Sequence, residues 1–509
     1  MGCDQQVTTV SRRNFLATAL VGLTQKSGAR IDGGFVHESH VVGHRLRDGA
    51  AFAAPRETRR VSVVIVGGGV AGLSAAWRLD KAGLRDVVVL EMESTAGGNA
   101  RWGENDVTAY PWGAHYVPVP GRAAGLVREL FTDLGVFADG HWDERHLVHA
   151  PVERLFMHGR WQEGIEPTVG TSLRDRDQFA RFDAAVERLR ATGRFTIPMA
   201  SGVEGAAPPA EDALSMAAWL EREGLDSPYL RWMVDYACRD DYGALAGDVS
   251  AWAGLLYFAG RDADGDGPLT WPEGNGWIVR RLLDRLGARV RTGQVTYRVE
   301  RRGRDWRVLT PDVEWLADVV IMATPLFIAS RLVDGAPWPQ LTYSAWFTAN
   351  LTLDRWPRER SFPVAWDNVL FDSPSLGYVV ATHQHLRRHV PRTVWTHYWA
   401  LAHQPADEAR RWLLAQDWPA LRDVTLADLR RAHPDIDQCV SRVDIMRFGH
   451  AMVRPTPGLL SNATWRAMQV GHDRVFYAHS DLSGLPLFEE AQYRGVLAAD
   501  RAMGVLGRG

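Results

Sequence analysis

The sequence predicts an α/β protein of two domains, and three observations support this prediction. The chain has 509 residues, which is more than a single hydrophobic core usually organises. Residues 61–91 read as a strand, a glycine turn, a helix and a second strand, the unit from which parallel sheets are built. Residues 343–353 and 393–403 alternate in character with period two, which predicts strands of a separate sheet.

The composition argues against several classes of partner. The net charge is −3, so there is no electrostatic case for nucleic acid or an acidic membrane. No apolar run approaches the ~20 residues that span a bilayer. Arginine dominates the basic residues, and Lys26 and Lys81 are the two lysines. Cys3, Cys238 and Cys439 lack the spacing of a metal site, and the sequence leaves open whether the last two form a disulfide.

The segment Ser11–Leu23, SRRNFLATALVGL, places an arginine pair before about nine mostly apolar residues. It resembles the bacterial twin-arginine signal, with an amphipathic helix of the globule as the alternative. The resemblance implies that residues 1–30 address the protein to the twin-arginine translocase, and so to the periplasm or the cell exterior. Because that route carries folded proteins, it also implies a cofactor bound before export. Residues 31–57 are expected to be an irregular N-terminal arm, and signal removal stays open.

The next segment carries a dinucleotide fingerprint. Val61–Val66 is a continuous apolar run, typical of a strand buried on both faces. Gly67, Gly69 and Gly72 follow as Gly-x-Gly-x-x-Gly, which lets backbone N–H groups and a helix N-terminus approach a diphosphate. Glu91 ends the second strand, where a carboxylate accepts hydrogen bonds from ribose hydroxyls. The pattern predicts a Rossmann-like domain, and the carboxylate argues against NADP.

The residues after the second strand favour FAD over NAD. They resemble the second signature of the flavin amine oxidase superfamily, which includes proteins similar to phytoene desaturase and protoporphyrinogen oxidase. The matching residues are Gly97, Gly98, Gly113, Ala114 and His115. Asn99 stands where that family usually has arginine, and Arg101 is the candidate to take over its phosphate contact.

The resemblance continues in three distant segments. Val295 matches a position whose backbone pairs with adenine, and Ala323 ends a strand beside the cofactor. Asp481, Glu489 and Ala491 match the C-terminal flavin motif, in which a helix N-terminus faces the isoalloxazine ring. The resemblance therefore implies a glutathione-reductase-type FAD domain with an α+β substrate domain inserted. The FAD domain would comprise residues 58–105, 270–335 and 465–509, and the substrate domain residues 106–269 and 336–464.

Seven residues are candidates for the substrate side of the site: Arg239, Asp241, Tyr242, His450, Met452, Arg454 and Leu487. The first three belong to a segment expected to be a polar break between two helices, where capping and an ion pair are the alternative. The aromatic residues of the alternating strands are expected to pack in the core rather than cage a substrate. The acidic turn at 262–273 and the histidines at 383–397 lack a complete metal-ligand set, so no metal is expected.

These features predict an exported, amine-oxidase-like FAD-dependent oxidoreductase. FAD would be held non-covalently, since no cysteine lies near either flavin motif, and a small organic substrate, with an amine as the candidate, would pass a hydride to flavin N5. The electron acceptor would be oxygen or an unidentified compound. The resemblance to flavin amine oxidases implies a lysine that holds a water near N5 and a pair of aromatic residues that cage the amine. Neither lysine of this sequence is placed for the first role, and Leu487 stands at a cage position, so no catalytic residue is assigned. The alternatives are a desaturase or dehydrogenase with a non-oxygen acceptor, and a flavin-binding protein without turnover.

Overall fold

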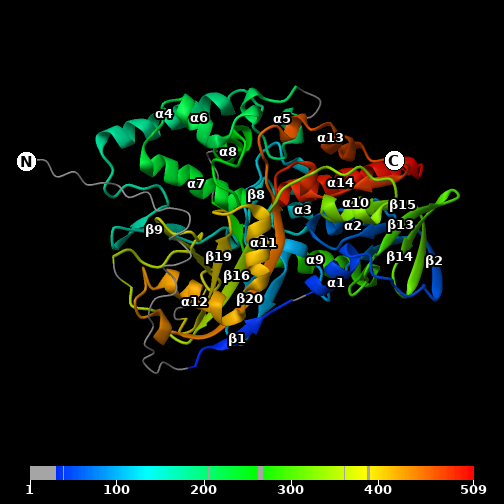
Figure 1. Cartoon of the computed structure of the whole chain (residues 1–509), viewed down its shortest axis with the longest axis horizontal. Helices are drawn as coiled ribbons and strands as arrows, with labels where there is room; N and C mark the ends of the chain where they lie inside the picture. Colours follow the sequence, from blue (N-terminus) through cyan, green and yellow to red (C-terminus); the bar gives the residue numbers. More distant parts are fainter. Residues whose placement is uncertain are drawn as a thin grey trace, which may run out of the picture.

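A computed structural model describes residues 30–37, 39–203, 207–261, 267–359, 361–386 and 390–508. The predicted signal lies outside these ranges except for Arg30, as do residues 262–266 of the acidic turn at 262–273. Figure 1 shows two halves, each built around one large sheet, with the C-terminal helix in the same half as the early dinucleotide segment. The predicted α/β class is confirmed.

One sheet has seven strands, in the order β12-β3-β2-β15-β14-β13, with β21 paired to the end of β15. The strands are β2 (Glu57–Val66), β3 (Val87–Leu90), β12 (Val290–Arg291), β13 (Arg298–Arg302), β14 (Asp305–Leu309), β15 (Val313–Met322) and β21 (Val475–Tyr477). The pairs β12–β3, β3–β2, β2–β15 and β15–β21 are parallel, whereas β13 and β14 add an antiparallel edge. The sheet thus joins three segments that are far apart in the sequence.

Strand β2 sits between two cores because its side chains alternate in direction. Val63 and Ile65 pack into a core with the helices α2, α3, α9 and α14, while Val64 and Val66 face a second core on the other side. The strand begins earlier than the apolar run, at Glu57, because residues 57–60, three of which are charged, pair with residues 313–316 of β15. A strand covered on both faces needs the continuous apolar run that the sequence shows.

The second sheet has eight strands, in the order β1-β20-β16-β19-β18-β17-β9-β10. They are β1 (Asp32–Phe35), β9 (Glu153–Met157), β10 (Arg160–Glu163), β16 (Tyr343–Leu353), β17 (Asp367–Leu370), β18 (Tyr378–Val380), β19 (Thr393–Ala400) and β20 (Val440–Val453). The expectation that residues 31–57 are irregular is wrong. β1 pairs in parallel with the edge of β20, the helix α1 follows, and β2 already begins at Glu57.

Helices surround both sheets. The helices are α1 (His40–Arg47), α2 (Val70–Lys81), α3 (Gly125–Asp133), α4 (Leu173–Arg190), α5 (Ala200–Val203), α6 (Met216–Arg222), α7 (Pro228–Tyr242), α8 (Ala251–Ala259), α9 (Gly276–Leu286), α10 (Leu326–Leu332), α11 (Ala406–Ala415), α12 (Trp418–Leu429), α13 (Ala463–Val470) and α14 (Phe488–Val505). The short strands are β4 (Trp102–Glu104), β5 (Ala109–Pro111), β6 (Tyr116–Val117), β7 (Phe137–Ala138), β8 (His141–Trp142) and β11 (Leu269–Thr270). In Figure 1, α4, α6, α7 and α8 form a layer of their own on the side of the eight-stranded sheet.

The segment expected to be a polar break is helical. Cys238 and Tyr242 lie in the last turns of α7, which ends at Gly243, a left-handed residue with φ 61°. The helix continues through the polar residues and ends at the glycine cap, so the break between the two helices lies after Tyr242. Cys238 and Cys439 are both free and buried, so the disulfide left open by the sequence does not form.

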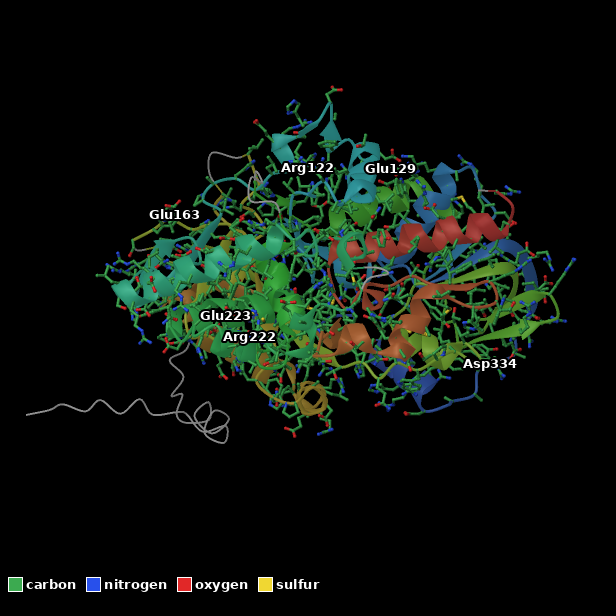
Figure 2. All side chains as sticks on the ribbon, turned by 90° about the horizontal axis from the view of Figure 1, so that it is seen from above. Arg122, Glu129, Glu163, Arg222, Glu223 and Asp334 are labelled. Carbon is green, nitrogen blue, oxygen red and sulfur yellow. The ribbon has the colours of Figure 1, made fainter. Side chains whose placement is uncertain are left out.

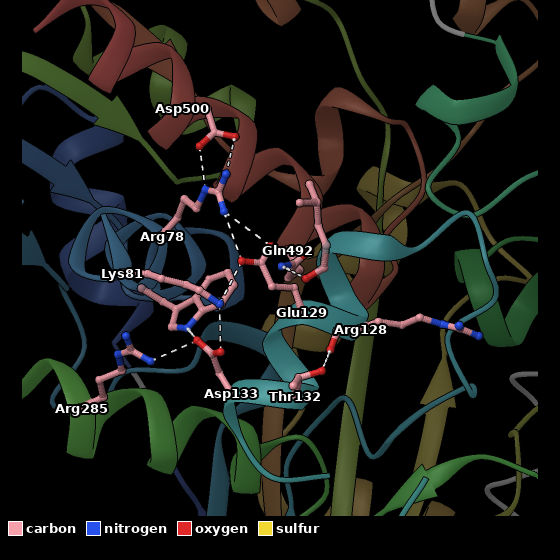
Figure 3. A network of polar contacts seen from close by, with 11 residues as sticks. Arg78, Lys81, Arg128, Glu129, Thr132, Asp133, Arg285, Gln492 and Asp500 are labelled. Carbon is pink, nitrogen blue, oxygen red and sulfur yellow. Dashed lines mark hydrogen bonds and ion pairs between the residues drawn. The ribbon is translucent and has the colours of Figure 1, made fainter. Parts of the chain in front are cut away.

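Charged side chains connect α2 to its neighbouring helices (Figure 3). Arg78 pairs with Asp500 of α14 at 2.7 Å and with Glu129 of α3 at 3.3 Å. Lys81 pairs with Glu129 and with Asp133, both at 2.9 Å. This network fixes the helix that carries the glycine loop, and it occupies Lys81.

Elsewhere, charges of both signs are spread over the molecule. Figure 2 shows Glu163, Arg222 and Glu223 on one half and Asp334 on the other. Arg222 and Glu223 pair with each other at 3.3 Å. Among the residues that the structure describes, no helix combines the length and the apolar character needed to cross a membrane.

The contact between α14 and α2 provides a test of this packing. A Cβ on Gly495 would collide with the carbonyl of Ala71, whereas a Cβ on Gly504 of the same helix would meet nothing within 4 Å. We expect Gly495→Ala to lower the free energy of unfolding by about 1–3 kcal/mol through overpacking. Gly504→Ala should be neutral or stabilise by up to about 1 kcal/mol, because alanine favours the helix. Urea unfolding followed by circular dichroism measures both, and equal effects would contradict the close contact.

Candidate active site

The glycine loop after β2 is shaped by close backbone contacts. Gly67 has φ 108°, and a Cβ there would collide with the carbonyl of Ala323 at the end of β15. A Cβ on Gly72 would collide with the carbonyl of Gly67. Gly69 immediately precedes α2, whose N-terminus has no side-chain cap. The loop therefore brings backbone N–H groups and the positive end of the helix dipole to one place, as diphosphate binding requires.

A second glycine turn lies against the first. Gly97 forms an isolated bridge with Gly69 and donates from its N–H to the carbonyl of Gly68 at 2.8 Å. Gly97 and Gly98 have φ 126° and 56°, which favour glycine. A Cβ on Gly113 would collide with the carbonyl of Asn99, so a third glycine closes the same cradle.

Glu91 stands at the end of β3 with its carboxylate turned toward this cradle. It accepts hydrogen bonds from the N–H groups of Gly68, at 2.7 Å, and Glu93, at 2.8 Å. Burial raises the pKa of Glu91, against the lowering effect of these two bonds. The N–H of Gln294 donates to the Glu91 carbonyl at 2.8 Å, which places the neighbouring Val295 beside the same strand end.

Arg101 is buried, and its polar atoms are only partly satisfied. Its Nε donates to the Gly98 carbonyl at 3.0 Å, while Nη1 lies 3.7 Å from Glu93 and makes no hydrogen bond with any described residue. Burial lowers the pKa of Arg101. The side-chain amide of Asn99 instead donates to the carbonyl of Ala451 at 2.7 Å. An unmatched guanidinium N–H beside a helix N-terminus suits a phosphate oxygen, so these residues fit a dinucleotide.

Asp481 lies in a short 3-10 turn, Ser480–Leu482, that follows β21, and it is buried. It accepts from the Leu326 N–H at 2.9 Å and from the Tyr343 hydroxyl at 2.6 Å, and it pairs with His479 at 3.0 Å. Burial would raise the pKa of Asp481, but His479 and these hydrogen bonds outweigh burial and lower it. Through Tyr343 of β16 the carboxylate connects the two halves of the molecule, and its contact with the cofactor stays a prediction.

The start of α14 faces a cavity. Leu487 and Glu489 line this cavity, and burial raises the pKa of Glu489 to about 7. The carboxylate of the next residue, Glu490, does not line the cavity and accepts a hydrogen bond from the Met199 N–H at 2.6 Å. Ala491, one residue further on, packs half-buried against the core around α2 and α14.

The cavity lies where the two halves meet. The segment from Gly113 to Tyr116 and the start of α14 line one side, and Trp346, Thr348 and Tyr398 of the eight-stranded sheet line the other. His115 stacks on Tyr398 with ring centroids 4.7 Å apart, and the Tyr398 hydroxyl donates to the Gly113 carbonyl at 2.9 Å. Burial lowers the pKa of His115 to about 4, so its imidazole is neutral near pH 7.

Carboxylates from the end of α7 also line this cavity. Asp241 pairs with Arg261 at 3.1 Å, whereas Asp240 has the Tyr116 hydroxyl, at 3.5 Å, as its polar contact among the described residues. Burial and the charge of Asp241 raise the pKa of Asp240. Asn275, which lines the same cavity, is 1% exposed, and its Oδ1 accepts no hydrogen bond from the described residues.

The predicted substrate residues divide into two groups. Asp241, Met452 and Leu487 line the cavity. Arg239, Tyr242, His450 and Arg454 do not line it, and for these four residues substrate contact stays a prediction. Arg239 donates to the carbonyls of residues 373–375, the Tyr242 hydroxyl donates to the Ala253 carbonyl, His450 packs on Phe327 and Arg454 donates to Ser344.

Several residues that line the cavity were not predicted from the sequence. Trp346 and Tyr398 lie on the alternating strands, whose aromatics were expected to be core residues. They are largely buried and also face the cavity, so period-two alternation could identify the strands but not the face that borders a site. Arg261 and Asn275 also line the cavity, but no sequence motif marked either residue as part of a site. Among the described residues, no group of three His, Cys, Asp or Glu could hold a metal ion.

Comparisons with known proteins agree with this geometry. Residues 65–134 match the family model of an NAD(P)-binding Rossmann-like domain. The 15-cis-phytoene desaturase of Glycine max is 25% identical over 180 residues, which cover 34% of this chain and 30% of the desaturase. The chain thus matches less than a third of that relative's length.

Two solved structures extend the similarity to most of the chain. Putrescine oxidase bound to putrescine has a TM-score of 0.67 at 17% identity, covering 88% of this chain and all of the oxidase. Cyclohexylamine oxidase from Brevibacterium oxydans has a TM-score of 0.65 at 17% identity, covering 88% and 99%. The chain has the fold of these oxidases. The predicted combination of a Rossmann-like domain with a second α+β region is therefore confirmed.

The raised pKa of Glu489 predicts a pH-dependent stability. The folded protein holds this proton more tightly than an unfolded chain, so the stability due to Glu489 falls as pH rises from 4.5 to about 7. Glu489→Gln removes this loss and should raise the free energy of unfolding at pH 8 by about 3 kcal/mol, with little change at pH 4.5. Glu163→Gln, at an exposed position, is the control. Thermal unfolding at both pH values measures the difference, and equal shifts at both would contradict the prediction.

Proposed function

We propose that the protein is an FAD-dependent oxidoreductase that oxidises a small organic amine. The observation that carries the proposal is the placement of the cavity, since Gly113 belongs both to the dinucleotide cradle and to the cavity wall. A dinucleotide running from Glu91 past Gly69 would place its far end at this wall. The similarity to two amine oxidases and to a desaturase supports the redox class.

The chain's own residues have separable tasks in this proposal. Arg101 and the α2 N-terminus hold the diphosphate, and Glu91 accepts from a ribose hydroxyl. Bound FAD would supply the hydride acceptor. His115 and Tyr398 form an aromatic wall that excludes water from the cavity. Asp240 makes no ion pair with any described residue, although the charge of Arg261 acts on it, and a carboxylate at this position suits the ammonium group of an amine.

The lysine content favours a second candidate, a dehydrogenase or desaturase with an acceptor other than oxygen. Lys81 is the one lysine in the described part of the chain, and Glu129 and Asp133 hold it beside α2. The resemblance to flavin amine oxidases implies a lysine near N5, and the described part of the chain offers none besides Lys81. This difference favours an electron acceptor other than oxygen.

Purified protein tests the cofactor and the reaction class together. We expect a yellow protein that releases FAD on acid precipitation, and whose absorbance near 450 nm is bleached by an amine under anaerobic conditions. Rapid recovery in air supports the oxidase, and slow recovery the dehydrogenase. Flavin that no donor reduces would leave a binding protein without turnover, and failure to take up FAD would contradict every version.

Arg101 tests the diphosphate contact. Arg101→Met should weaken FAD binding about 10-fold, as expected when a charge-assisted hydrogen bond is lost. Arg145→Met, which changes an exposed arginine paired with Asp143, is the matched control. Equilibrium dialysis of apoprotein with FAD measures both variants. Equal affinities would remove Arg101 from the cofactor site.

We also propose export by the twin-arginine route, on the basis of Arg12 and Arg13 in the segment at residues 11–23. Replacing both arginines by lysine should retain the protein in the cytoplasm of a bacterial host that has the translocase. Fractionation followed by immunoblotting measures the location. Unchanged export of the double variant would contradict the proposal.

A further inference from the structure

The N-terminal segment before β2 crosses from one half of the molecule to the other. Its first part, β1, lies along β20 of the eight-stranded sheet, and its second part, α1, lies on the side of the dinucleotide-binding half (Figure 1). We call residues 32–37 and 39–52 the N-terminal strap. They contact both halves and precede the first strand of the Rossmann-like domain.

We propose that the N-terminal strap is an additional part of the dinucleotide site, which covers the adenosine and diphosphate end and retains the bound cofactor. The proposal rests on the proposed binding of FAD. It follows from three contacts of the strap, each of which reaches a residue next to, or packed against, one placed in the cradle.

The first contact is at the ribose end. The Ser39 hydroxyl donates to a carboxylate oxygen of Glu93, and the Glu93 N–H donates to the Glu91 carboxylate at 2.8 Å. The turn after β3 is therefore held from outside by the strap and from inside by Glu91. Its Gly97 end forms the cradle, so the strap braces the turn that encloses the ribose.

The second contact is over the diphosphate. His37 meets the edge of Trp112 with ring centroids 6.3 Å apart, and its pKa is lowered by burial and by the nearby charge of Arg101. The Trp112 N–H donates to the Arg101 carbonyl at 3.0 Å. Val36 packs in the same cluster as Trp112. The strap thus covers the backbone that carries the unmatched guanidinium of Arg101.

The third contact is at the adenine end. Phe52 stacks on Tyr297 with centroids 4.9 Å apart and planes within 4°, and Arg45 lies over the same Phe52 ring at 5.1 Å. Tyr297 is two residues from Val295, whose neighbour Gln294 is bonded to Glu91. The three contacts therefore reach residues that adjoin Glu91, Arg101 and Val295, and none of them involves a residue that lines the cavity.

The anchor of the strap is β1, and two adjacent glycines allow it to be released selectively. Gly33 has φ 134°, and a Cβ there would collide with the carbonyl of Val443 in β20. A Cβ on Gly34 would meet nothing within 4 Å. Gly33→Ala should detach β1 from β20, whereas Gly34→Ala leaves the same strand in place. Ser39→Ala removes the brace on Glu93, and Val41→Ala, at a residue 58% exposed on α1, is its control.

The experiment measures the rate at which each FAD-loaded protein releases flavin on dilution, from the rise in free-flavin fluorescence. We expect Gly33→Ala and Ser39→Ala to release FAD at least 5-fold faster than wild type, and the two controls to match wild type. Thermal unfolding of the apoproteins should give equal midpoints for Ser39→Ala and Val41→Ala, which separates retention from folding.

Three results would count against the proposal. Release from Ser39→Ala at the rate of Val41→Ala, together with release from Gly33→Ala at the rate of Gly34→Ala, would show that the strap does not retain the cofactor. Wild-type protein that takes up no FAD would overturn the proposed function as well. Faster release from Gly33→Ala alone, with a lowered apoprotein midpoint, would show a folding effect and also count against the strap.

Discussion

The parallel pairing of β2 with β15 is the interaction on which the rest of the structure depends. It joins residues 57–66 to residues 313–322, so the chain must complete most of its length before the central strand gains its second neighbour. The end of β15 then supplies both Ala323, which packs against Gly67, and the edge on which β21 pairs. Through β21 the pairing also positions α14, whose first turn forms a wall of the cavity. A long-range strand pair thus determines where the glycine loop, the cofactor cradle and the cavity lie relative to one another.

The parts that could be predicted from the sequence are those whose geometry is set within a few residues. The turn at Gly67 requires a positive φ and close backbone contacts, and such a requirement is visible as a glycine in the sequence. The partners of Asp481 and the pairing of β1 are different, because the contacts that decide them come from residues more than 100 positions away. Asp481 matched the cofactor motif in sequence, and its bonds to Leu326 and Tyr343 cannot be read from its neighbours. Local pattern therefore predicts elements and turns well, and it predicts the direction of a polar side chain poorly.

The same distinction explains the substrate side of the candidate site. Arg239 and Asp241 are two residues apart on α7, yet one donates to backbone carbonyls at residues 373–375 and the other lines the cavity. On a helix, residues two positions apart point about 200° away from each other, so at most one of them can face a given cavity. Because the segment was interpreted as an irregular polar break, this constraint was not applied, and both residues became candidates for substrate contact. A correct helix boundary at Gly243 would have forced a choice between them.

Within the proposed oxidation, the protonation states of the cavity limit which group can move a proton. An ammonium substrate must lose a proton before its C–H bond can give a hydride. His115 is a poor candidate to accept it, because its pKa of about 4 makes the imidazole a weak base, and the pKa of the Tyr116 hydroxyl is raised well above 10 by burial. Glu489, with a pKa of about 7, changes its charge in the physiological range. The pKa of Asp240 is also raised above the ordinary value of an aspartate. A base is most effective when its pKa lies near the working pH. The carboxylates at the start of α14 and the end of α7 are therefore the groups of this cavity best suited to accept the substrate proton, a task that needs no lysine.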